Sequence, residues 1–167
     1  LASGKGEIKT SDDGINATGV RPWFAMTGGD WQVDTGGDGF DSNGAAYVGG
    51  GKMVIDGPAD ARAASLDAES GLEIDGGTLF AAGPAGMDET PSSGSSQTAI
   101  KVDTSVKAQA TVTIVDSNGK ELVKHKPSKD VSSIFFSSSG MAKGKEYKVL
   151  VDGKEAAKAK AGQFGKK

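Results

Sequence analysis

Aspartates recur at a fixed spacing in the first half of the chain, inside turn-forming loops. Residues 9–19 read KTSDDGINATG and residues 34–44 read DTGGDGFDSNG, so the loop has a second copy 25 residues further on. Side chains at equivalent positions of two stacked coils lie about 4.8 Å apart. Bare carboxylates at that distance repel each other and raise each other's pKa. The spacing therefore predicts a column of carboxylates whose charge has to be neutralised.

A calcium ion suits such a column, because it binds about six to eight oxygens from carboxylates, carbonyls and water. The candidate ligands are Asp12, Asp13, Asn16, Asp38, Asp41, Asn43 and Asp67. The alternative is that these side chains only cap turns and form a hydrogen-bonded ladder along the stack. A ladder of that kind is built from Asn, whereas this column is mostly Asp. The sequence therefore favours Ca²⁺ as the cofactor.

Aromatic residues between the two loops and just after the second are candidates for binding a polysaccharide, because flat rings stack on sugar rings. The candidates are Trp23, Phe24, Trp31 and Tyr47, of which Trp23 follows Arg21 and Pro22 in a predicted loop. We assign carbohydrate binding to Trp23, Trp31 and Tyr47. The alternative for each is packing against a neighbouring loop.

The sequence offers little support for catalysis. Its single histidine, His125, stands in a Lys-rich segment without a Ser or Cys motif, and we interpret it as a surface residue. A calcium-dependent polysaccharide lyase would need a base such as Lys9, Arg21 or Arg62, and the spacing selects none of them. We expect no enzyme and no catalytic residue.

The elements that must position the aspartates also repeat. Three apolar columns recur at a coil length of about 25 residues, which fits a parallel β-helix with three short strands in each coil. The first column is Ile8, Val33, Ile55 and Ala81, the second is Ile15, Phe40, Leu66 and Met87, and the third is Val48, Ile74 and Ile100. Asn16, Asp41, Asp67 and Asp88 each follow a member of the second column. We therefore expect similar side chains at equivalent positions to stack on one another over three to four coils.

The period disappears after about residue 105, and the pattern becomes that of antiparallel strands. Residues 110–115 and 121–124 flank the turn DSNG and predict a hairpin, and residues 132–136 and 146–151 predict two more strands. The predicted organisation is all-β: a parallel β-helix over residues 1–104 and a small antiparallel sheet over residues 105–167. Because an open β-helix end exposes unpaired backbone, we interpret the second region as a terminal cover. We expect residues 156–167 to be loosely held.

Composition and charge narrow the class of protein further. The 167 residues include 26 Gly and no Cys, so no disulfide framework is available. Residues 1–90 carry 5 Lys and Arg against 15 Asp and Glu, a balance of −10, and residues 91–167 carry 14 against 7, a balance of +7. We interpret the basic half as a solvated surface with no nucleic-acid partner. No apolar run is long enough to span a membrane, and the chain begins with Leu1, so we expect a processed chain or a fragment.

Several motifs in order resemble one family, the carbohydrate-binding-domain-containing proteins of bacterial surfaces. They are DDGINA, GDGFDSNG followed by GG-x-x-x-x-x-GP, SLD at residues 65–67, GGTLFAAG at 76–83, GM at 86–87 and SSQ at 95–97. The match spans residues 6–103, and the FFSS and GKEY segments resemble the C-terminal part of the family. The resemblance implies a right-handed parallel β-helix, bound calcium and non-catalytic binding of cellulose or pectic chains outside the cell. It carries calcium ligation to Asp13, Asp38, Asp41, Asn43 and Asp67.

The coils that family members have before DDGIN are absent here, which motivates a second hypothesis. A bare first coil is a template for strand addition. The alternative function is therefore a structural surface protein that assembles end to end into filaments, and the third is the lyase.

Overall fold

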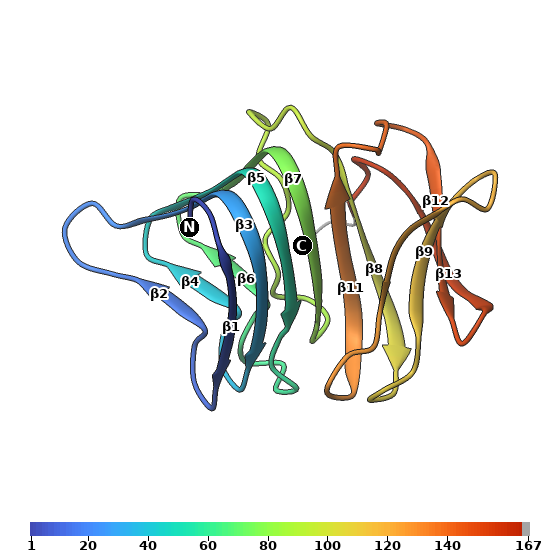
Figure 1. The fold of residues 1–167 in the computed structure, drawn as a ribbon, viewed down its shortest axis with the longest axis horizontal. Coiled ribbons are helices and arrows are strands. Elements are labelled where there is room, and N and C mark those ends of the chain that lie inside the picture. The colour runs from blue at the N-terminus through green and yellow to red at the C-terminus, as the bar shows by residue number, and fades with distance from the viewer. Residues whose placement is uncertain (165–167) are drawn as a thin grey trace.

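Short segments in which apolar and polar residues alternate are separated by turns that contain glycine. A computed structural model describes residues 1–164 and shows strands and turns throughout (Figure 1). The strands are β1 (Lys5–Thr10), β2 (Ile15–Ala17), β3 (Trp23–Thr35), β4 (Phe40–Ser42), β5 (Ala45–Asp56), β6 (Leu66–Ala68), β7 (Leu72–Gly83), β8 (Ala99–Val106), β9 (Val112–Asp116), β10 (Glu121–His125), β11 (Val131–Ser138), β12 (Glu146–Val151) and β13 (Lys154–Lys160). The described residues include no helix, and so none that could cross a membrane.

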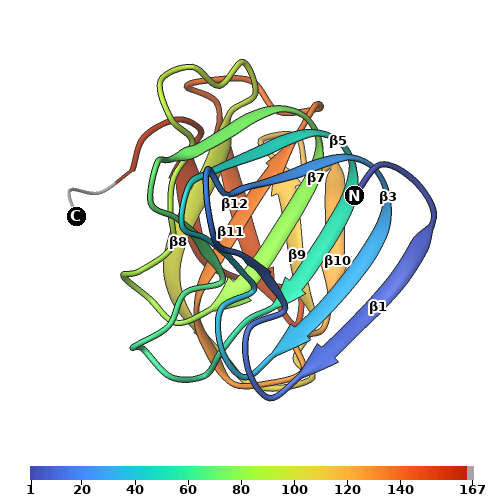
Figure 2. The ribbon, with the colours of Figure 1, turned by 90° about the vertical axis from the view of Figure 1, so that its left-hand side faces the viewer.

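The first half winds into a β-solenoid of about three turns. One wall holds the long strands β1, β3, β5 and β7, which pair in parallel in that order. The facing wall holds the short strands β2, β4 and β6, also parallel. Figure 2 looks onto the end of the solenoid at which β1 and β2 lie. The predicted parallel β-helix is confirmed.

The predicted apolar columns are confirmed where they lie in paired strands. Ile8, Val33, Ile55 and Ala81 are direct neighbours across β1, β3, β5 and β7. Ile15, Phe40 and Leu66 are neighbours across the short wall. Both rows point inward, and the interior core includes the rings of Phe24 and Phe40, stacked with centroids 5.0 Å apart. Burial of these side chains is the main source of the solenoid's stability.

Two predicted column members are wrong, and both lie where the period ends. Met87 is 52% exposed, because residues 84–98 cross the end of the solenoid as a loop instead of forming a fourth short strand. Ile100 does not lie above Ile74. It pairs with Phe136 and packs on the other face of the long wall, because β11 and β8 extend that wall.

The long wall continues beyond β7 with strands from the second half of the chain. β11 lies antiparallel between β7 and β8, so the sheet order is β1-β3-β5-β7-β11-β8. The remaining strands form a separate antiparallel sheet in the order β10-β9-β12-β13. The predicted hairpin is confirmed as β9 and β10. Residues 156–160 were expected to be loose, and this is wrong, because they belong to β13 and pair with β12. Residues 165–167 lie outside the described residues.

The four-stranded sheet packs on the outer face of the long wall and gives the protein a second core. Val54, Phe80, Phe136 and Ile100 form a row across β5, β7, β11 and β8. They pack with Val112, Ile114, Tyr147 and Val149 of the four-stranded sheet. Along each long strand, alternate side chains therefore enter one core or the other, as expected for a strand buried on both faces.

Candidate metal centre

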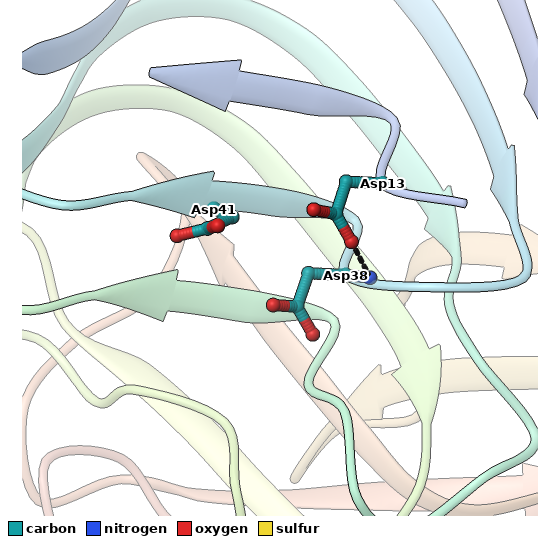
Figure 3. Close-up of side chains that lie close together, drawn as sticks. All are labelled: Asp13, Asp38 and Asp41. Carbon is teal, nitrogen blue, oxygen red and sulfur yellow. Dashed lines mark hydrogen bonds between the residues drawn. The ribbon is translucent and has the colours of Figure 1, made fainter. Parts of the chain in front are cut away.

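The sharp turns that lead into the short wall place three carboxylates side by side. Asp13 comes just before β2, Asp38 just before β4, and Asp41 lies within β4. One oxygen from each of the three lies within 4.8 Å of the others (Figure 3). The predicted stacking of Asp13 on Asp38 is confirmed, because the backbone N–H of Asp38 donates to Asp13 Oδ1 at 2.9 Å.

A glycine allows the coils to approach this closely. A Cβ on Gly39, the residue after Asp38, would lie 2.3 Å from the carbonyl oxygen of Ser65 on the next coil. No side chain fits there, since real Cβ contacts are not found below 3.0 Å. Gly14 after Asp13 and Gly39 after Asp38 are therefore part of what holds these carboxylates at coil spacing.

Hydrogen bonds use some of the carboxylate oxygens and leave others available. Asp38 Oδ1 accepts from the backbone N–H of Ala64 at 2.6 Å. The amide of Asn16 donates to Asp13 Oδ2 at 3.1 Å and to Asp41 Oδ2 at 3.3 Å. Asn16 therefore bridges the two coils within the cluster. The donors to this group are neutral N–H groups, so the negative charges are not balanced by these bonds.

Burial and the uncompensated charge together raise the pKa of two carboxyls in the cluster. Burial raises the pKa of Asp38, with the bond from Ala64 opposing it and the charges of Asp13, Asp67 and Asp41 adding to it. Burial also raises the pKa of Asp41, and the charges of Asp67, Asp13 and Glu69 add to it. Both carboxyls are therefore harder to ionise than an isolated aspartate. A cation at this position would remove the repulsion.

The other predicted ligands lie at the edge of this group or away from it. Asp67 is the register neighbour of Asp41, as predicted, and its charge acts on both Asp38 and Asp41. Asp12 is exposed, and its backbone N–H donates to Thr10 Oγ1. Asn43 follows β4 at the other end of the short strand, where its amide contacts Glu69 Oε1 at 3.4 Å. Asp12 and Asn43 are therefore not part of the three-carboxylate group.

The sequence pattern missed one carboxylate near the cluster, Glu69, and misplaced another, Asp88. Glu69 adds negative charge near Asp41, and its position two residues after Asp67 is the signal that could have found it. Asp88 was expected above Asp67, and this is wrong. It turns into the protein, where its Oδ1 accepts from the N–H groups of Ser65 at 2.6 Å and Leu66 at 3.1 Å. Burial raises the pKa of Asp88 to about 6.

The predicted sugar-binding aromatics lie in different environments. Trp23, at the start of β3, is 67% exposed. Trp31 is half-buried over Gly6, and its indole N–H donates to the carbonyl of Gly28 at 3.1 Å. Tyr47 is half-buried against Gly49. The interpretation of Phe24 as an exposed candidate is wrong, because its ring is buried on Phe40.

The residues weighed for catalysis are engaged in structural contacts. His125 is not a surface residue, because its Nε2 lies 2.8 Å from Asp56 Oδ1 and its ring packs edge-on against Phe80. It therefore links β10 to the solenoid. Arg62 forms an ion pair with Asp60, and Lys9 forms one with Asp34. Two of the three candidate bases are thus paired away from the carboxylates.

The cluster can hold a hard cation, because every side-chain ligand it offers is an oxygen and none is sulfur or imidazole. Asp13, Asp38 and Asp41 supply the carboxylates, and the amide of Asn16 supplies a fourth oxygen when it is turned over. No family model, no curated protein and no solved structure matches this chain significantly. The arguments on function therefore rest on the geometry.

Proposed function

We propose that this chain is an extracellular, non-catalytic polysaccharide-binding module in which Ca²⁺ stabilises the solenoid. The observation that carries the proposal is the group of three carboxylates contributed by two successive coils. A cation bound there links the turn before β2 to the turn before β4 and removes the repulsion between them. Magnesium is less suitable, because it demands a more regular octahedron and retains its water.

Two features support a glycan as the ligand. The ring of Trp23, at the start of β3, is exposed and available to stack on the face of a neutral sugar such as a glucose unit of cellulose. The acidic half of the chain, with its balance of −10, repels a polyanion unless a cation lies between them. A pectic chain would therefore bind through the calcium ion, and cellulose through Trp23.

The contacts of the candidate bases give less support to the lyase hypothesis than the site gives to non-catalytic polysaccharide binding. A lyase needs a base beside the metal. Lys9 and Arg62 are paired with Asp34 and Asp60, and His125 of β10 contacts Asp56 at the end of β5.

The test is retention of the protein on insoluble cellulose and on calcium pectate, each with and without a chelator. We expect retention on at least one matrix, with chelation weakening retention on pectate more than on cellulose. A Trp23→Ala variant should lose cellulose retention and keep its unfolding temperature. If neither matrix retained the protein while Ca²⁺ still raised its unfolding temperature, glycan binding would be contradicted and calcium binding would be supported.

A further inference from the structure

The long strands β3, β5 and β7 each turn a corner, which divides the long wall into two flat parts (Figure 2). A pair of glycines forms the corner of each strand, and the second glycine of each pair has a positive φ, of 91°, 82° and 79° in chain order. Glycine adopts this backbone conformation far more readily than other residues. The glycine pairs are residues 28–29, 50–51 and 76–77. The segments before the corner are residues 23–27, 45–49 and 72–75, and we call their outer surface the leading face.

The leading face is left uncovered by the four-stranded sheet. Among residues 1–164, the second core takes Val54, Phe80 and Ala82 of the long wall, all beyond the corner, and no residue from the segments before it. The inward side chains of those segments, such as Phe24 and Val48, belong to the interior core. Because side chains alternate along a strand, the residues between them point outward. The outward residues are Trp23, Ala25, Ala45, Tyr47, Glu73 and Asp75.

Two aromatic side chains of the leading face lie on neighbouring strands. Tyr47 is the register partner of Ala25, so Trp23, two residues earlier, is its diagonal neighbour, at about 8 Å between the two Cα atoms. The side chain of Trp23 is exposed. The ring of Tyr47 lies over Gly49, since a Cβ on Gly49 would be 2.6 Å from Tyr47 Cε1 and 2.7 Å from its hydroxyl oxygen. With Ala25 and Gly49 as their small neighbours, both rings are accessible to a ligand that crosses the strands.

The third strand of this face adds carboxylates. Glu73 is exposed and is the direct register partner of Tyr47. Asp75 accepts from the backbone N–H and from the hydroxyl of Ser96, both at 2.8 Å. A carboxylate accepts hydrogen bonds from sugar hydroxyls and repels another anion. The leading face therefore suits a neutral sugar chain and disfavours an acidic pectic chain.

We infer that a neutral, extended glucan such as a single chain of cellulose lies across the strands of the leading face. One sugar stacks on Trp23, another stacks on Tyr47, and Glu73 accepts hydrogen bonds from hydroxyls of the same chain. Because the three contacts belong to three successive strands, the ligand runs along the solenoid axis and covers more than one sugar. Trp31 is not a contact, since its ring packs against the interior core and its indole N–H donates to Gly28. The inference rests on the proposed polysaccharide-binding function and adds the position and direction of the chain.

Isothermal titration calorimetry of the full chain at saturating Ca²⁺ tests the inference with cellobiose and cellotetraose. Cellotetraose should bind about fivefold or more tightly than cellobiose, because the longer chain reaches all three contacts. Tyr47→Ala should weaken the binding of cellotetraose by about fivefold or more and leave retention on calcium pectate unchanged. Tyr47→Phe, which keeps the ring, should bind cellotetraose within about twofold of the native chain.

Two further variants test the floor and the carboxylate of the site. Gly49→Ala keeps the ring of Tyr47 but displaces it, because the added methyl would lie 2.6 Å from Tyr47 Cε1. It should weaken the binding of cellotetraose by about threefold or more in a folded protein. Glu73→Ala should have an effect of similar size through the lost hydrogen bonds. The matched control is Glu121→Ala, at an exposed carboxylate of β10, and it should bind like the native chain.

The outcomes separate this inference from the proposed function. If Trp23→Ala abolished binding while Tyr47→Ala and Gly49→Ala bound cellotetraose like the native chain, the site across the leading face would be wrong and polysaccharide binding would stand. Equal affinities for cellobiose and cellotetraose would overturn the inference in the same way. A native chain that bound neither oligosaccharide but was retained on calcium pectate would overturn the inference and leave only the calcium-mediated contact. Retention on neither cellulose nor pectate would contradict both proposals.

Discussion

The backbone N–H of Asp38 points at the carboxylate of Asp13 on the preceding coil, 2.9 Å away. The carboxylate of Asp38 in turn accepts from Ala64 on the following coil. Each aspartate thus ties its coil to the next one. The same arrangement gathers negative charge at one corner of the solenoid, which is why that corner is the candidate metal centre.

The first prediction concerns removal of one charge from this centre. Asp38→Asn keeps an oxygen to accept from Ala64 and deletes the charge, so in chelator the variant should be as stable as the native chain or more so. Saturating Ca²⁺ should stabilise the native chain by about 3 kcal/mol at one hundred times the dissociation constant, and the variant by much less. Thermal unfolding with and without Ca²⁺ measures both. Asp12→Asn, which lies outside the group, should respond to calcium like the native chain.

The second prediction concerns pH. The pKa of Asp88 is raised by burial from 3.8 to about 6. The folded state therefore holds this proton more tightly than the unfolded state, so its stabilising contribution is present below about pH 4 and is lost as the pH rises through 6. The loss corresponds to roughly 3 kcal/mol. Urea unfolding of the native chain and of Asp88→Asn between about pH 4 and 7 should show a difference in stability that grows with pH.

The control for that experiment is Asp103→Asn, at an exposed position of β8. This variant should keep the pH dependence of the native chain. Parallel curves for the native chain and Asp88→Asn would show that the buried carboxyl does not titrate in this range.

The third prediction separates binding from packing among the aromatics. Trp23→Ala should change the free energy of unfolding by less than about 0.5 kcal/mol, because the side chain is exposed. Trp31→Ala should destabilise the protein by about 2 kcal/mol or more, because its ring packs on Gly6 and the interior core. Chemical denaturation measures both, and cellulose retention is measured in parallel. Equal loss of retention in the two variants at full folding would contradict the assignment of the sugar contact to Trp23.

The fourth prediction concerns coil stacking. Gly39→Ala should destabilise the protein by about 2–3 kcal/mol, since the added methyl would lie 2.3 Å from the carbonyl oxygen of Ser65 and 2.5 Å from Ile55 Cγ2. Gly140→Ala is the matched control, because the nearest atom to its added methyl is Ser138 Oγ at 3.9 Å. Both are measured by urea unfolding. Similar values for the two variants would show that the coils separate to make room at Gly39.

The sequence by itself determined which residues are vertical neighbours within the repeat. Asn16, Asp41 and Asp67, and likewise Ile8, Val33, Ile55 and Ala81, lie where a period of about 25 residues predicts them. This works because a solenoid makes contacts one coil away, so sequence spacing is converted directly into distance.

Only the tertiary structure decided what happens where the period ends. A fourth coil would have placed Met87, Asp88 and Ile100 in the columns, yet β11 takes the position beside β7 and the loop of residues 84–98 covers the short wall. The pairing of β11 with β7, and the contact of His125 with Asp56, join residues more than 45 positions apart. No local sequence pattern predicts these long-range contacts. They form because apolar side chains are buried in the second core, between the long wall and the four-stranded sheet.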